Sequence, residues 1–158
     1  MEFFVSLKNS FLLPKKEALF RLNRVSMRNT ITYIVILLFL LFLPDVIQSV
    51  IHFEGNTDIP RSMYILQLVV MYPFLIIFLS VAGISLLALG SYLLKMIFNR
   101  KLIYQQLWKM TTFALTIPLI LYTLLKHNVG TNGLVNVIPI IILYVLIGKM
   151  ITVFPKRK

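Results

Sequence analysis

Four long, uninterrupted apolar stretches constrain this chain more than any other feature of its sequence. They cover roughly residues 31–51, 63–94, 107–125 and 134–153. Each is long enough to cross a hydrocarbon layer ~30 Å thick, which takes about 20 helical residues. Lipid offers the backbone no hydrogen-bond partners, so a spanning segment must be a helix or belong to a closed barrel. Because the apolar runs are continuous and do not alternate, they predict helices and exclude barrel strands.

The predicted fold is therefore all-α: a polytopic membrane protein with four transmembrane helices in residues 30–153. Hydrophobic residues make up 59% of the chain, well above the ~45–50% of an ordinary soluble domain. Residues 1–29 and a basic tail, 154–158, leave no room for a second soluble domain. The first apolar run is expected to be retained, because about 30 residues precede it and no small-residue cleavage site follows it.

The second apolar run is long enough to raise the question of one span or two. Its 32 residues would make a helix of roughly 48 Å. Splitting it near Pro73 or Gly83 would leave no charged turn between the halves, so we expect one long span that is tilted, kinked or reaches past the bilayer. Each apolar run contains one proline, and we expect ordinary kinks there in preference to gating hinges: Pro44, Pro73, Pro118 and Pro139.

The net charge of +11 would suit nucleic-acid binding, but the positions of the charges favour a membrane role. Under the predicted topology, 14 Lys and Arg residues fall on one side of the membrane and two on the other. Such a bias sets the orientation of a membrane protein, with the basic side in the cytoplasm. Both termini are therefore predicted to be cytoplasmic, and no nucleic-acid partner is expected.

The N-terminal segment combines apolar residues at helical spacing with basic residues, and Pro14 interrupts it. We interpret it as one or two amphipathic interfacial helices, with the apolar side toward lipid and the basic side toward headgroups; the alternative is a frayed, solvated tail. The cations expected to bind anionic lipid headgroups are those of this segment and of the second inner connection: Lys15, Lys16, Arg21, Arg24, Arg28, Arg100 and Lys101.

A stripe of small residues runs along the second span. Small residues let membrane helices approach closely, where lipid supplies no hydrophobic drive for association. The stripe predicts a helix-packing face, for a partner protein or another copy of the chain: Ala82, Gly83, Ser85, Ala88, Gly90 and Ser91.

Groups able to carry chemistry are few. The chain has no cysteine, which excludes disulfides and thiolate metal sites, and none of the common catalytic motifs is present. His52, Glu54, Asp58 and His127 could meet as a metal site, but solvated loop residues are the favoured reading. Asp45, near the end of the first span, is the one candidate intramembrane polar residue. We expect no catalytic residue, metal or cofactor.

Two segments carry a resemblance to a known family. One runs from Phe11-Leu12-Leu13-Pro14-Lys15-Lys16 through Phe20-Arg21 and Tyr33 to Leu43-Pro44; the other runs from Arg100-Lys101-Leu102-Ile103-Tyr104-Gln105-Gln106-Leu107-Trp108-Lys109 to Thr116-Ile117-Pro118. With the apolar last span and basic tail, they resemble the bacterial domain-of-unknown-function 1189 family, some members of which are labelled "maltodextrin utilisation protein". The resemblance implies a bacterial plasma-membrane location and at most an association with sugar uptake. It brings no catalytic residues.

The leading hypothesis is a non-enzymatic accessory or scaffold protein that binds anionic lipid and a membrane partner or a second copy. The runner-up is a small transporter, channel or lipid-translocating protein, suggested by the proline in every span and by Asp45. An intramembrane enzyme ranks third.

Overall fold

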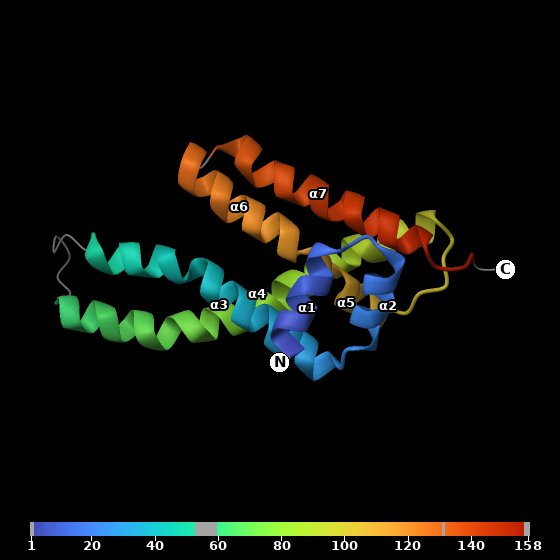
Figure 1. Ribbon diagram of the computed structural model, residues 1–158. Coiled ribbons are helices and arrows are strands. Elements are labelled where there is room, and N and C mark those ends of the chain that lie inside the picture. The colour runs from blue at the N-terminus through green and yellow to red at the C-terminus, as the bar shows by residue number, and fades with distance from the viewer. Residues whose placement is uncertain (1, 53–59, 131, 157–158) are drawn as a thin grey trace.

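The computed structural model of the chain describes residues 2–52, 60–130 and 132–156, apart from the side chains of Glu2 and Val129. These residues fold into helices joined by short connections (Figure 1). In chain order the helices are α1 (Glu2–Phe11), α2 (Lys16–Arg24), α3 (Met27–Ile51), α4 (Arg61–Ile97), α5 (Tyr104–Ala114), α6 (Thr116–Val129) and α7 (Gly133–Thr152).

The four predicted membrane spans are confirmed as long apolar helices. Helices α3, α4 and α7 each provide one, and α5 and α6 together provide the fourth, over Tyr104–Asn128. The second span is a single helix, as predicted, and Pro73 does not interrupt it. Its 37 residues make a helix of roughly 55 Å, which exceeds the ~30 Å of hydrocarbon that a span must cross.

At the end of α4 that is predicted to face the cytoplasm, Asn99 caps the helix and adopts the left-handed backbone conformation with φ 49°. The Asn99 N–H donates to the Met96 carbonyl at 3.1 Å, and the Arg100 N–H donates to the Lys95 carbonyl at 3.3 Å. This pair of bonds is a Schellman motif, which satisfies carbonyls that the helix leaves unpaired. The motif turns the chain sharply and delivers Arg100 to the neighbouring C-terminal segment.

The third span breaks between α5 and α6 at Leu115. Pro118 accounts for the break, because it has no N–H to donate to the Ala114 carbonyl four residues earlier. Helix α5 lies at the centre of the molecule and packs against α4, α7, α2 and α3 (Figure 1). Its Met110, Phe113 and Ala114 are almost fully buried. The third span can therefore be the least hydrophobic of the four, because its inner half contacts protein instead of lipid.

The two helical hairpins, α3–α4 and α6–α7, meet near α5 and diverge toward the end away from the termini (Figure 1). On the diverging half of α4 most apolar side chains are exposed, including Val69 (66%), Phe74 (69%) and Phe78 (63%). Exposed apolar area of this extent is a liability in water. It is the expected surface of a helix that faces lipid.

The two N-terminal helices are separated at Pro14, as predicted, and the Leu13–Pro14 peptide is cis. Helix α2 packs its apolar side, Leu19 and Leu22, against the protein. Helix α1 does the opposite: its Ser6 and Ser10 are buried against the bundle while Phe4 and Phe11 are exposed. The outward side of α1 therefore carries aromatic residues, as the prediction of an apolar side toward lipid requires, whereas α2 departs from that prediction because its apolar side contacts protein.

Candidate functional site

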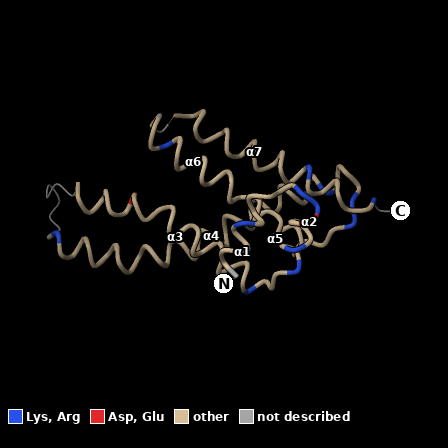
Figure 2. Tube along the Cα trace, in the orientation of Figure 1, with Lys and Arg blue, Asp and Glu red and all other residues tan. Residues whose placement is uncertain are grey.

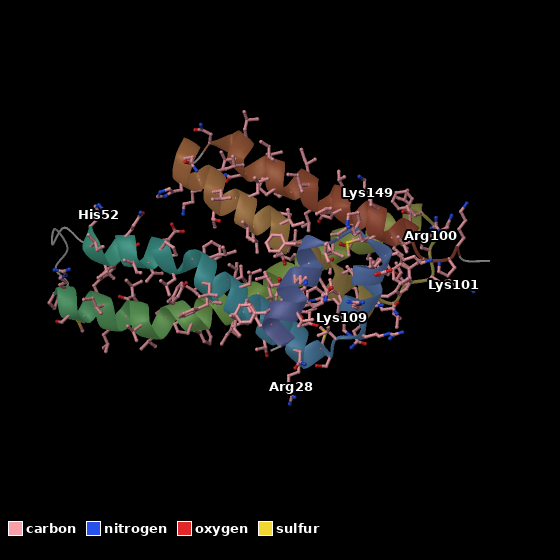
Figure 3. All side chains as sticks on the ribbon, viewed as in Figure 1. Arg28, His52, Arg100, Lys101, Lys109 and Lys149 are labelled. Atoms are coloured by element: carbon pink, nitrogen blue, oxygen red, sulfur yellow. The ribbon has the colours of Figure 1, made fainter. Side chains whose placement is uncertain are left out.

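Basic residues from four separate segments lie toward the end of the molecule that holds α2 and the C-terminus (Figure 2). We call this the basic surface and define it by the exposed Lys15, Lys16, Arg21, Arg24, Arg28, Lys101, Lys149 and Lys156 and the partly buried Arg100. Figure 3 labels Arg100, Lys101 and Lys149 at this end, Arg28 nearer the middle of the view at the start of α3, and His52 at the opposite end. All seven cations predicted to bind lipid headgroups belong to the basic surface.

The α4–α5 connection is joined to the C-terminal tail, so the two contribute to the basic surface as a unit. The Lys101 N–H donates to the Pro155 carbonyl at 3.2 Å, and the Arg100 guanidinium donates to the Phe154 carbonyl. The Phe154 ring also meets the Phe20 ring of α2, with 5.7 Å between centroids. These contacts hold three distant parts of the sequence side by side.

Lys109 fastens α2 to α5 and does not point to lipid. Its ammonium donates to the backbone carbonyls of Val25, at 2.6 Å, and Asn23, at 3.3 Å. Both carbonyls lie at the C-terminal end of α2, where a helix leaves carbonyls unpaired and a cation is stabilising. Lys109 lies inside α5, and the sequence alone could not reveal the carbonyls that it binds.

The basic surface carries little opposing charge. Among the side chains that the structure describes at this end, the acidic one is Glu17 of α2. Each Lys or Arg near an anionic membrane surface contributes about 1 kcal/mol to binding. The basic surface therefore has enough cations to bind anionic headgroups.

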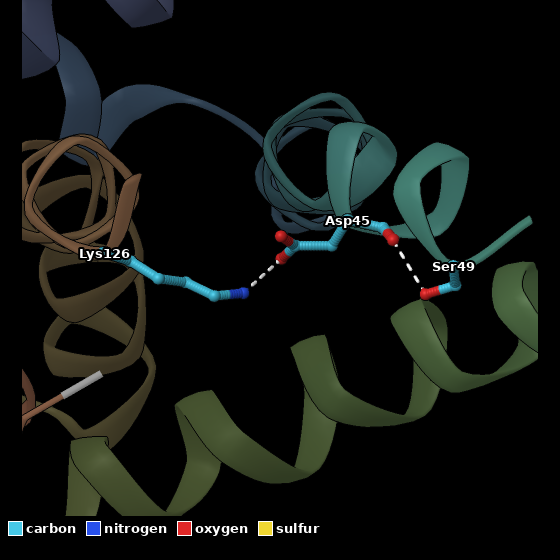
Figure 4. A network of polar contacts seen from close by, with 3 residues as sticks. All are labelled: Asp45, Ser49 and Lys126. Atoms are coloured by element: carbon cyan, nitrogen blue, oxygen red, sulfur yellow. Dashed lines mark hydrogen bonds and ion pairs between the residues drawn. The ribbon is translucent and has the colours of Figure 1, made fainter. Parts of the chain in front are cut away.

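A second polar feature lies between the diverging hairpins. A cleft of about 540 Å³ opens between α3 and α6, and its lining is Leu40, Leu41, Pro44, Asp45, Gln48, Thr123, Leu124, Lys126 and His127. Across it the Lys126 ammonium and the Asp45 carboxylate form an ion pair at 2.7 Å (Figure 4). The two side chains are 33% and 42% exposed, so the pair is open to its surroundings.

Asp45 was the predicted intramembrane polar residue, and its partner was missed. Lys126 lies inside α6, three residues before the helix ends, and 81 positions after Asp45 in the sequence. The sequence did contain one indication of this partner, because a lone carboxylate near a membrane span is usually paired with a cation at similar depth. Ser49 bonds the Asp45 backbone carbonyl at 2.8 Å (Figure 4) and leaves the carboxylate to Lys126.

Hydroxyl groups occupy the interior of the bundle. The Tyr33 hydroxyl lies 2.8 Å from the Thr116 hydroxyl and 3.4 Å from that of Ser10, joining α3, α6 and α1. The Ser91 and Thr111 hydroxyls lie 2.9 Å apart and join α4 to α5. Hydroxyls buried in membrane proteins bond across helices or back to their own helix, and this network is a structural one.

Most residues of the predicted small-residue stripe pack against other helices of the chain, and the remaining ones do not. Ala88 and Ser91 are fully buried, and a Cβ on Gly90 would lie 2.3 Å from the Tyr144 hydroxyl of α7. The Ser85 hydroxyl accepts from the Trp108 indole at 3.3 Å. Ala82 and Gly83 are half-exposed, and a Cβ on Gly83 would meet nothing within 4 Å.

The two histidines do not come together as a site. His52 is exposed at the end of α3 and bonds the Gln48 carbonyl at 3.0 Å, and His127 lines the cleft. Glu54 and Asp58 lie outside the described residues, as do the last two residues of the tail. Within the described ranges, no three His, Cys, Asp or Glu residues are grouped as a metal site would need.

One comparison with known proteins gives a match. The family described as "Protein of unknown function (DUF1189)" matches the chain over residues 54–154. The match covers α4 to α7 and the Arg100–Lys109 segment, and it begins after the N-terminal segment that resembles the same family. No curated protein and no solved structure gives a significant match.

Proposed function

This chain belongs to the DUF1189 family of proteins of unknown function, and from that premise we propose that it is a non-enzymatic accessory or scaffold protein of the bacterial plasma membrane. It binds anionic phospholipid through the basic surface and holds a partner membrane protein, or another copy of itself, against its spans. Both termini and the basic surface face the cytoplasm. The association with sugar uptake stays a hypothesis.

One observation carries the lipid half of this proposal: cations distant in the sequence are held together at one end of the bundle. Hydrogen bonds to backbone carbonyls hold these segments in place: the Arg100 guanidinium and the Lys101 N–H donate to the tail, and the Lys109 ammonium donates to the end of α2. The exposed aromatic face of α1 supports the same placement, because Phe4 and Phe11 enter lipid while the cations of α2 stay at headgroup level. Juxtamembrane basic groups of this kind attract anionic lipid.

The partner half of the proposal rests on α4. Gly83 leaves open space on the helix surface, and small residues of this kind admit a second helix at close range. Co-purification from mild detergent tests it: we expect a bound membrane protein or a second copy, and its loss in Gly83→Leu. A parent chain that emerges as a lone monomer would argue against this half.

The lipid half is tested with the purified full-length protein in detergent. We expect phosphatidylglycerol to raise the midpoint of thermal unfolding more than phosphatidylcholine, and salt to weaken the effect. The triple variant Lys16→Gln, Arg21→Gln, Arg24→Gln removes exposed cations of α2 and should lose the difference. Arg61→Gln, an exposed cation at the other end of the bundle, should keep it. Equal effects of the two lipids on the parent protein would refute the lipid half.

A specific observation favours the second candidate, a small transporter, channel or lipid-translocating protein. The cleft between α3 and α6 carries a paired carboxylate and ammonium, Asp45 and Lys126, and intramembrane ion pairs mark many substrate pathways. Measuring solute flux or lipid movement in vesicles for the parent and Asp45→Asn decides the matter. An inactive parent protein ends this candidate.

A further inference from the structure

We propose that the cleft between α3 and α6 is a binding site for one aminophospholipid, a lipid whose headgroup carries a phosphate and a primary ammonium. The site is separate from the basic surface, lies toward the opposite end of the bundle and does not depend on the proposed function. Its polar rim is formed by Asp45, Gln48, Lys126 and His127, and its apolar part includes Leu40, Leu41 and Leu124.

The order of polar and apolar groups along α3 matches that of a phospholipid. Asp45 lies six residues before the end of α3 at Ile51, which is roughly 9 Å along the axis. Leu40 and Leu41 lie about one further turn inward. A molecule with its head at Asp45 would therefore lay its chain along Leu40 and Leu41, where the hydrocarbon core begins.

The size of the cleft selects a chain-like occupant. A helix about 10 Å across would fill 540 Å³ within roughly 7 Å of its length, which is about four to five residues. A transmembrane helix of a partner would need a groove several times longer. A flexible hydrocarbon chain fits a space of this size and can leave it sideways between the diverging hairpins.

The charges select the headgroup. Asp45 and Lys126 carry one charge of each sign, so the rim attracts an ammonium and a phosphate together. A lysine ammonium has three N–H donors and a carboxylate has about four acceptor positions; the ion pair uses one of each. The remaining donors suit a phosphate, and the remaining acceptors suit a primary ammonium, with charge-assisted hydrogen bonds to both. Phosphatidylcholine lacks the N–H donors, and phosphatidylglycerol lacks the cation.

Native mass spectrometry of the delipidated full-length protein tests the site, with phosphatidylethanolamine, phosphatidylcholine and phosphatidylglycerol of identical chains added in equal amounts. We expect phosphatidylethanolamine to be retained in preference to phosphatidylcholine. Asp45→Asn should lower that preference about tenfold, the effect of ~1.4 kcal/mol, and Lys126→Gln should lower retention of both lipids. Arg61→Gln is the matched control and should behave as the parent protein.

Leu40→Trp keeps the rim charges and fills the apolar part of the cleft, so it serves if Asp45→Asn or Lys126→Gln does not fold; it should reduce retention of phosphatidylethanolamine. The triple variant of α2 should lose phosphatidylglycerol and keep phosphatidylethanolamine, which separates this site from the basic surface. A parent protein without the preference, an Asp45→Asn variant that keeps it, or a polypeptide crosslinked in the cleft would each overturn the proposal.

Discussion

Gly90 sets how closely α4 approaches α7. A Cβ at this position would lie 2.3 Å from the Tyr144 hydroxyl oxygen and 2.8 Å from the adjoining ring carbon, so the ring or the helix must move. Gly90→Ala should therefore destabilise the protein by ~1–3 kcal/mol, the usual cost of overpacking. Reversible unfolding in mixed micelles measures this difference.

Gly83→Ala is the control for that experiment, because it makes the same change in the same helix where no atom lies within 4 Å. It should be neutral or stabilise by up to ~1 kcal/mol through helix propensity. Equal effects of the two substitutions would show that Tyr144 does not rest on Gly90.

Lys109 carries a second prediction at this scale. Lys109→Met keeps the length of the side chain but leaves the Asn23 and Val25 carbonyls without their ammonium donor. Removing the hydrogen-bond donor of these partly buried carbonyls costs ~1–3 kcal/mol. Helix α2 should therefore detach from α5 more often. Faster tryptic cleavage at Lys15, Lys16 and Arg21 in folded protein measures the detachment. Lys101→Met, which removes an exposed cation of the connection just before α5, should leave the cleavage rate unchanged. A cleavage rate in Lys109→Met equal to that of the parent protein would contradict the assigned role.

Residue types predicted some of these roles and not others. Asp45 stood out because a carboxylate near a span is rare, and small residues on α4 indicated close packing. The partners of these residues, Lys126 and Tyr144, lie 81 and 54 positions away. Such pairings depend on how the hairpins are arranged, which local sequence does not encode.

At the scale of elements, the break between α5 and α6 controls the direction of α6. Pro118→Ala restores an N–H for the Ala114 carbonyl, so α6 should continue the axis of α5 and carry Lys126 away from Asp45. We expect a changed distance between spin labels at Gln48 and Asn128, both exposed. Pro73→Ala is the control, because α4 runs through Pro73 without a break. An unchanged distance in Pro118→Ala would show that packing, and not the proline, sets the bend.

The helices were the part of this structure that the sequence predicted best. Apolar length alone predicted four spans, and the absence of charge between residues 63 and 94 correctly favoured one long helix. Four prolines looked alike in the sequence, yet one of them, Pro118, coincides with a break. Helices α1 and α2 show the limit of face assignments: α1 turns Phe4 and Phe11 outward, whereas α2 buries Leu19 and Leu22 against protein. Periodicity finds the apolar side of each helix, but only the surroundings decide whether that side meets lipid or protein.

For the whole molecule, the charge bias predicts that the basic surface faces the cytoplasm, and the contacts of Arg100, Lys101 and Lys109 hold that surface together. The divergence of the two hairpins, and with it the cleft, could not be predicted, because it follows from the packing of every span around α5. The orientation decides which leaflet of the membrane supplies the lipid at each end.

Labelling of single cysteines in intact bacterial cells tests that orientation most directly, since the natural chain has no cysteine. His52→Cys and Lys101→Cys place one thiol at each end of the bundle, both at exposed positions (Figure 3). With a membrane-impermeant maleimide, we expect His52→Cys to react in intact cells and Lys101→Cys to react only after the membrane is permeabilised. Reaction of Lys101→Cys in intact cells, with protection of His52→Cys, would contradict the cytoplasmic placement of the basic surface.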